Sequence, residues 1–130
     1  MVGPNPAVLT LPPTPIAEAA ELSTSDLKQM ATEIAKEHSL NTDHFLKVIS
    51  CESNWDTQIQ SAYITKDGTR ENSWGLVQIN LSAHPNVTKE QALNPRFALT
   101  WMAEQWSLDG ASMWSCWTIL QARGWSLSTP

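Results

Sequence analysis

Apolar residues between positions 27 and 35 recur at the spacing of an amphipathic helix. The positions i, i+3, i+4, i+7 and i+8 of this stretch are Leu27, Met30, Ala31, Ile34 and Ala35. This spacing places all of them on one face of a helix. The run from Ser23 to Asp26 directly before it consists of residue types that cap helix N-termini. The sequence therefore predicts a helix that begins in this run and buries one face.

A second helical pattern follows, and one charged residue lies on its apolar face. Asn41 or Thr42 can cap the start of this helix. The positions i, i+3, i+4 and i+7 are Phe45, Val48, Ile49 and Glu52. Glu52 therefore lies on the apolar stripe and not on the solvent face. A carboxylate in that position is the strongest sign in the pattern itself that Glu52 has a special role.

The middle of the chain changes to turn-rich, β-type patterns. Residues 63–70 read as a hairpin with Asp67-Gly68 at its turn. Residues 74–79 form a short apolar run that predicts a strand or an extended segment.

The last third of the chain again predicts helices. Residues 88–91 form a capping box that opens a short helix. Asn94-Pro95 is an N-cap followed by proline at the first helical position, and Asp109-Gly110 is expected to end that helix. Ser112 can cap a last helix that runs to Gly124. Helices dominate around one small hairpin region, which predicts an α+β fold.

The N-terminal part of the chain has a different composition. Residues 1–22 contain five of the eight prolines, and Pro12-Pro13-Thr14-Pro15 fits neither a helix nor a central strand. We therefore expect an arm or linker over residues 1–22 and one domain over residues 23–130. Met1 to Pro6 lack the basic start and apolar stretch of a signal peptide. The chain is thus expected to be a fragment without its export signal, or to be released by another route.

Charge and hydrophobicity exclude some partners. The net charge is −5, whereas nucleic-acid binding calls for a basic face. No apolar run approaches the roughly 18 residues of a membrane helix. We expect a monomer that binds no nucleic acid and does not span a membrane.

The two cysteines, Cys51 and Cys116, leave two alternatives open. Two cysteines cannot form a tetrahedral zinc site by themselves, and the three histidines show no ligand spacing, so we expect no metal and no cofactor. Either the two cysteines pair or they are separate buried thiols.

Two sequence blocks together resemble the lysozyme-like superfamily, whose members cleave the sugar backbone of peptidoglycan. The first block runs from Cys51 to Trp55, and the second, Asn72-Ser73-Trp74-Gly75-Leu76-Val77-Gln78-Ile79-Asn80, follows about twenty residues later. The resemblance covers roughly residues 43–120. It implies a lysozyme-like, mostly helical fold with one small antiparallel β-hairpin region beside an active-site cleft.

One departure narrows the resemblance. Animal-type lysozymes place an aspartate, their second carboxylate, two positions before the glycine that matches Gly75, and here that position is Ser73. The pattern Ser-x-Gly-Leu-x-Gln-Ile is similar to goose-type lysozymes and soluble lytic transglycosylases, in which one glutamate does both acid and base work. The resemblance assigns the acid/base role to Glu52 and substrate contact to Ser73 and Gln78.

A glutamic acid can donate a proton at neutral pH only if its pKa is raised, and an apolar wall does this by desolvation. Lysozymes are a known example of a glutamic acid whose pKa is raised in this way. By this resemblance, Ile49 and Trp55 are expected to form the apolar wall beside Glu52. A Glu52 side chain that simply points to water is the alternative.

Further residues are candidates for the site. Glu71 and Asp56 are candidate second carboxylates, although a solvated strand-end charge is the favoured interpretation of Glu71 and a capping role that of Asp56. Trp55 and Trp74 are nearest to the two blocks and are expected, with Glu71, to contact substrate. His84 can line the cleft, but a surface-loop position is favoured. Core packing is expected for Trp101, Trp106, Trp114 and Trp117.

The resemblance predicts cleavage of peptidoglycan between N-acetylmuramic acid and N-acetylglucosamine, of the lytic transglycosylase type, in a secreted or periplasmic protein. The alternatives are a hydrolysing muramidase that uses the same site and a glycan-binding module without catalysis, because fold alone does not settle function. Disulfides persist outside the cytoplasm, so this reading favours a bond between Cys51 and Cys116.

Overall fold

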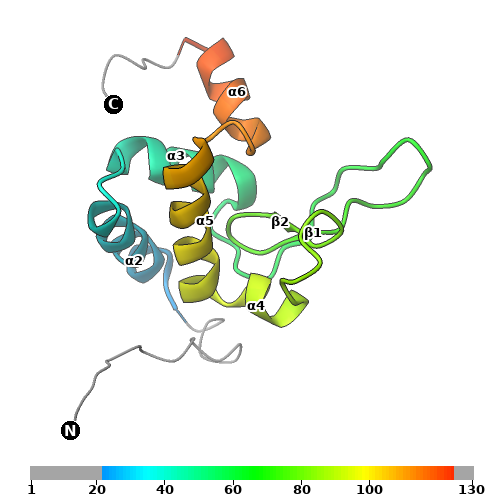
Figure 1. Cartoon of the computed structure of the whole chain (residues 1–130), viewed down its shortest axis with the longest axis horizontal. Coiled ribbons are helices and arrows are strands. Elements are labelled where there is room, and N and C mark those ends of the chain that lie inside the picture. The colour runs from blue at the N-terminus through cyan, green and yellow to red at the C-terminus, as the bar shows by residue number, and fades with distance from the viewer. Residues whose placement is uncertain (1–21, 125–130) are drawn as a thin grey trace, which may run out of the picture.

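Residues 22–124 are described by the computed structural model in Figure 1, so residues 1–21 of the predicted arm lie outside the described part. Helices make up most of the elements, with one small antiparallel hairpin beside them, which confirms the α+β prediction. In chain order the elements are α2 (Thr24–Glu37), α3 (Thr42–Ser53), β1 (Ser73–Trp74), β2 (Ile79–Asn80), α4 (Lys89–Leu93), α5 (Pro95–Asp109) and α6 (Ser115–Ala122).

The N-terminus of α2 is capped as predicted. Ser23 Oγ accepts a hydrogen bond from the backbone N–H of Asp26, and the Asp26 carboxylate accepts one from the backbone N–H of Ser23. This reciprocal pair satisfies two N–H groups that a helix start leaves unpaired. The predicted apolar face is buried at Leu27, Ala31, Ile34 and Ala35, with Met30 at its edge, and α2 packs against α3 and α5.

The second helix, α3, begins and ends at polar residues with distinct roles. Asn41 caps its start by accepting from the backbone N–H of His44 over 2.9 Å. Asn54 and Trp55, just past its end, both have left-handed backbone conformations, with φ of 51° and 64°. The chain therefore turns away sharply after Ser53, which leaves the half-buried Glu52 in the last turn of a helix whose other face packs in the core.

The predicted strand over residues 74–79 is wrong. Ser73 pairs with Asn80 and Trp74 with Ile79, so the segment folds back on itself as the hairpin β1–β2. Gly75, with φ of +81°, starts the tight turn, and its carbonyl accepts from the backbone N–H of Gln78. A glycine at a position that needs a left-handed conformation explains why an apolar run becomes a turn here.

The predicted hairpin over residues 63–70 forms a projecting loop with limited pairing (Figure 1). An isolated bridge between Ile64 and Arg70 takes the place of two strands. The Asp67-Gly68 turn is present, with Gly68 at φ +87°. Hydrogen bonds from Thr65 and Thr69 hold the pKa of the Asp67 carboxyl at about 2. Side chains such as Ile64 are exposed here, so no core extends the pairing.

Capping governs the next two helices as predicted. Thr88 and Gln91 form the capping box of α4, and Asn94 caps α5 with Pro95 at its first position. Gly110 follows the last residue of α5.

The last helix differs from the prediction at its start. Helix α6 begins at Ser115, with Trp114 as its N-cap residue, and not after Ser112. Trp114 makes no side-chain capping bond because a cap must accept and an indole N–H can only donate; this N–H donates to the carbonyl of Val77 over 2.8 Å. A buried tertiary hydrogen bond therefore overrides the local capping preference of Ser112.

The C-terminal part is tied to the core by aromatic rings and by a disulfide. Trp114 is buried, and Trp101, Trp106 and Trp117 pack partly buried against the core, which confirms their predicted packing role. Cys51 of α3 and Cys116 of α6 are bonded, with Cα atoms 5.9 Å apart, so the disulfide prediction is confirmed. The bond fixes the first turn of α6 beside the end of α3.

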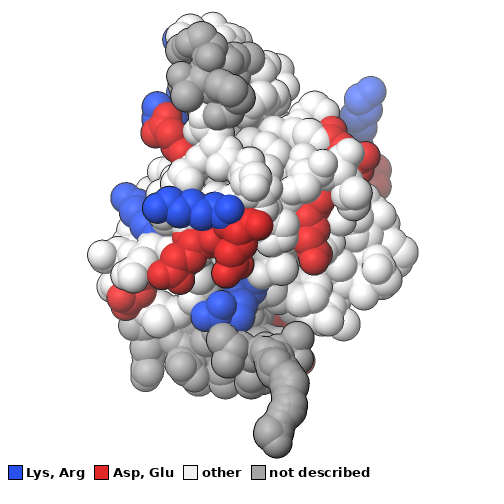
Figure 2. All heavy atoms as spheres, turned by 60° about the vertical axis from the view of Figure 1, so that its left-hand side comes forward, with Lys and Arg blue, Asp and Glu red and all other residues white. Residues whose placement is uncertain are grey.

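The charged side chains on the face in Figure 2 are of both signs and interspersed, with broad uncharged areas between them. Within the described part of the chain, no helix is both long and apolar enough to cross a membrane.

Candidate active site

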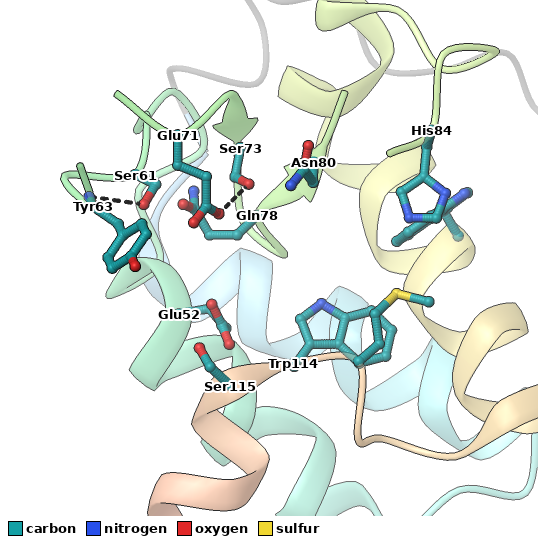
Figure 3. A pocket seen from close by; sticks show the side chains of 12 residues that line it. Glu52, Ser61, Tyr63, Glu71, Ser73, Gln78, Asn80, His84, Trp114 and Ser115 are labelled. Atoms are coloured by element: carbon teal, nitrogen blue, oxygen red, sulfur yellow. Dashed lines mark hydrogen bonds between the residues drawn. The ribbon is translucent and has the colours of Figure 1, made fainter. Parts of the chain in front are cut away.

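A cavity of about 410 Å³ lies between the end of α3, the hairpin with its preceding loop, and the segment that leads into α6 (Figure 3). Four predicted site residues meet there: Glu52 from the end of α3, and Glu71, Ser73 and Gln78 from the hairpin region later in the chain. The full set of lining residues is Glu52, Ser61, Tyr63, Glu71, Ser73, Gln78, Asn80, His84, Trp101, Met113, Trp114 and Ser115.

Glu52 lies in the last turn of α3, half-buried, with its carboxyl group in the cavity. Burial raises the pKa of this carboxyl. A hydrogen bond from the backbone N–H of Cys116 to Glu52 Oε2, at 3.1 Å, acts in the opposite direction, and the negative charge of Glu71 raises the pKa further. The net shift is upward, so Glu52 holds its proton to a higher pH than an exposed glutamate does.

The opposite wall carries a hydroxyl paired with a second carboxylate. Ser73 is only 1% exposed, and its Oγ donates a hydrogen bond to Glu71 Oε2. Both side chains come from the strand side of the hairpin and face the cavity above Glu52 (Figure 3). Glu71 is half-buried on the cavity wall and accepts from Ser73, so it has more contacts than the favoured interpretation of a solvated strand-end charge supposes. Asp56 keeps its predicted local role, because its carboxylate accepts from the backbone N–H of Gln58.

Gln78 combines a structural role with its place on the cavity wall. Its Nε2 donates to the carbonyl of Gly75 over 2.9 Å and to that of Ile59 over 3.2 Å. Gln78 itself has a left-handed backbone, with φ of 54°. The side chain therefore stabilises the hairpin turn and at the same time forms part of the cavity wall.

Trp55 and Trp74 are not among the residues that line this cavity. Trp55 is 6% exposed, with the Nζ of Lys28 located 5.9 Å from its ring centroid. Trp74 lies under Lys89, whose Nζ is 3.9 Å from the ring centroid, and donates from Nε1 to Asn72. Closeness in sequence to the two blocks therefore gave the wrong aromatic residues for this cavity.

Two of the tryptophans expected in the core also line the cavity. Trp101 comes from α5, and Trp114 comes from the segment before α6. A large ring can pack one edge on the core and present the other to a cleft, and helical spacing does not distinguish these cases. His84 lies edge-on to Trp101, with ring centroids 4.9 Å apart, so His84 lines the cavity as well.

The remaining lining residues were missed by sequence reasoning. Asn80 could have been found from the sequence, because it is the last residue of the second sequence block. In the structure it pairs with Ser73 across the hairpin. Tyr63, the one tyrosine of the chain, is 61% exposed at the cavity mouth, and Met113 is also exposed there. Ser61 and Ser115 carry no local signal, because tertiary packing alone brings their segments to the cavity.

Among residues 22–124, no group of three or more His, Cys, Asp or Glu side chains could hold a metal ion. Comparison of the chain with models of protein families, with curated proteins and with solved structures gives no match.

The cavity has the parts that acid catalysis needs. The raised pKa of Glu52 lets this carboxyl keep a proton to donate up to a higher pH than an exposed glutamate does. Ser73 and Glu71 place a hydroxyl and a negative charge on the facing wall. Tyr63 and the half-buried Trp101 offer aromatic surface on the cavity wall.

Proposed function

We propose that this protein cleaves the glycan strands of peptidoglycan between N-acetylmuramic acid and N-acetylglucosamine, as a lytic transglycosylase with Glu52 as its single acid/base. The observation that carries the proposal is the half-buried Glu52 carboxyl in a cavity, with a raised pKa and with Ser73 on the facing wall. This matches the roles that the sequence resemblance assigns to both residues.

The reaction begins when protonated Glu52 gives its proton to the bridging oxygen, and the bond from that oxygen to the anomeric carbon breaks. The carbonyl oxygen of the substrate's own N-acetyl group attacks the anomeric carbon and forms a cyclic oxazolinium ion, while Ser73 contacts the same N-acetyl group. Ionised Glu52 then takes the proton of the sugar's 6-hydroxyl. The resulting oxygen closes onto the anomeric carbon, the oxazolinium opens, and a 1,6-anhydro end is left. This substrate-assisted route departs from the usual pair of catalytic carboxylates.

A hydrolysing muramidase is the second candidate. The second carboxylate in the cavity, Glu71, favours it, because a carboxylate that faces the cavity can also orient a water molecule. Water in place of the 6-hydroxyl leaves a reducing end. A glycan-binding module without catalysis is the third candidate, and the presence of Glu52 argues against it.

Mass spectrometry of peptidoglycan fragments after digestion separates the three candidates. Anhydro ends identify the transglycosylase, reducing ends identify the hydrolase, and intact glycan that still binds the protein identifies the module. The Glu52→Gln variant, assayed in parallel, shows whether any cleavage belongs to this site. The disulfide between Cys51 and Cys116 supports a site of action outside the cytoplasm, where such bonds persist.

A further inference from the structure

The hydroxyl of Ser73 has only one proton, and that proton lies in a hydrogen bond to Glu71. Ser73 Oγ donates to Glu71 Oε2, so toward any other group this oxygen can act only as an acceptor. Ser73 is almost completely buried, so its hydroxyl has little freedom to exchange that partner for water. A neutral hydrogen-bond acceptor backed by a carboxylate therefore faces the cavity from β1.

An acceptor at this place fits one part of an acetamido group. When the carbonyl oxygen of that group attacks the anomeric carbon, the amide N–H points away from the reacting carbon and is free to donate to an acceptor on the cavity wall. The nitrogen gains positive charge as the oxazolinium forms, so its N–H becomes a stronger donor. An acceptor coupled to an anion stabilises that charge more in the transition state than in the bound substrate.

We propose that Glu71 is a positioning residue that holds the Ser73 hydroxyl proton, so that Ser73 Oγ accepts from the N–H of the substrate's 2-acetamido group and leaves the acetamido oxygen free to attack. The assignment rests on the proposed function and deepens it. It also gives the site a substrate class: sugars with an N-acylated amine at the position next to the cleaved bond. No bond to Glu71 or Ser73 forms or breaks: Ser73 keeps its proton and Glu71 stays a carboxylate through the cycle.

The negative charge of Glu71 acts on a second group in the same cavity. Glu52 and Glu71 lie on opposite walls (Figure 3). The other groups on the Glu52 side of the cavity are the backbone N–H of Cys116 and the Ser115 side chain from α6, with Tyr63 from the loop nearby, whereas His84 lies at the far side of the cavity (Figure 3). The charge on Glu71 favours the protonated form of Glu52, which is the form that donates.

Two variants of Glu71 separate the hydrogen bond from the charge. Glu71→Gln keeps an oxygen at the same reach from Ser73 but removes the charge, and Glu71→Asp keeps the charge but withdraws it from Ser73. Cleavage of soluble N-acetylated glycan strands is followed as kcat and KM over pH, with unfolding midpoints measured alongside. Glu33→Gln, an exposed change on α2, is the matched control for a lost negative charge.

We expect kcat to fall about tenfold in each Glu71 variant, the effect of one charge-assisted hydrogen bond, with KM little changed. Glu71→Gln moves the basic limb of the pH profile to lower pH, because Glu52 loses the charge that helps it keep its proton. Glu71→Asp leaves that limb in place. In a Ser73→Ala background Glu71→Asp costs nothing further, because the acceptor through which Glu71 acts is gone.

Three results overturn the assignment alone: active wild-type protein with unchanged kcat in both Glu71 variants, a pH profile that Glu71→Gln does not move, or full additivity of Glu71→Asp with Ser73→Ala. Wild-type protein that leaves glycan intact overturns the proposed function, and this assignment with it. If one Glu71 variant fails to fold, the other variant and the Ser73→Ala pair carry the test.

Discussion

Cys116 holds Glu52 in place through its backbone, and the end of α3 through its sulfur. The backbone N–H of Cys116 donates to Glu52 Oε2 over 3.1 Å, and its sulfur is bonded to Cys51, the neighbour of Glu52. This N–H belongs to the first turn of α6, where N–H groups have no partner within the helix. The disulfide thus aims an unpaired helix donor at the carboxylate, which partly offsets the effect of burial on the pKa of Glu52.

Removal of the disulfide is expected to destabilise the fold. Replacement of both Cys51 and Cys116 by serine frees the loop between them, and the chain-entropy model gives a loss of about 4 kcal/mol in the free energy of unfolding. Urea denaturation of the variant and of the reduced wild-type protein measures this loss. Thiol titration of the unfolded, unreduced protein is the control and should find no free thiol. An unchanged urea midpoint would contradict the stabilising role.

Glu52→Gln is expected to fold and bind glycan but to lose turnover. Glutamine keeps the shape and can accept from the Cys116 N–H, but it has no acid proton to deliver. General acid catalysis contributes roughly a hundredfold to ten-thousandfold, so the rate should fall by that range. Glycan cleavage is followed by mass spectrometry, with Glu33→Gln as the control. Activity within a few-fold of wild type would remove Glu52 from the mechanism.

The raised pKa of Glu52 also predicts a pH dependence of stability. A carboxyl whose pKa is higher in the folded than in the unfolded protein contributes stability below its ordinary value of 4.5, and this contribution is lost as pH rises through the folded pKa. Glu52→Gln has no such group. The variant should therefore gain stability relative to wild type as pH rises from below 4.5 to neutral. Urea unfolding of both proteins at the two pH values gives the difference, and a constant difference would argue against a raised pKa.

Local chemistry made the helices of this fold predictable. Ser23, Asn41, Thr88 and Asn94 cap the helices that the sequence assigned to them, because each cap depends on residues within one turn. The apolar spacing of α3 likewise predicts the helix face on which Glu52 lies, because this spacing depends only on residues of the helix itself.

Long-range contacts decided the features that sequence reasoning missed. Ser112 is a good cap, but the bond from Trp114 to Val77, distant in sequence, fixes where α6 begins. The choice of aromatic cavity residues failed for a similar reason. Trp55 is close to Glu52 in sequence, yet the turn after α3 buries it, whereas packing of α5 and α6 brings Trp101 to the cavity.

Gly75→Ala is expected to be strongly destabilising because two separate constraints meet at this residue. Its backbone has a φ of +81°, which costs a residue with a side chain about 1–2 kcal/mol. A Cβ atom there would also lie 2.1 Å from the backbone carbonyl oxygen of Ala92 in α4, so the hairpin and α4 must move apart. Such overpacking adds about 1–3 kcal/mol.

Gly68→Ala is the matched control for this change. Gly68 has a similar φ of +87°, but no atom lies within 4 Å of a Cβ added there. Gly68→Ala should therefore lower the free energy of unfolding only through its backbone conformation, by about 1–2 kcal/mol. Urea unfolding of both variants should therefore separate the steric contact with Ala92 from the backbone conformation. Because Gly75 begins the turn between Ser73 and Gln78, its variant should also lower glycan cleavage at temperatures where it remains folded, while Gly68→Ala should not. Equal losses of stability in the two variants would show that the approach of β1 to α4 is not tight.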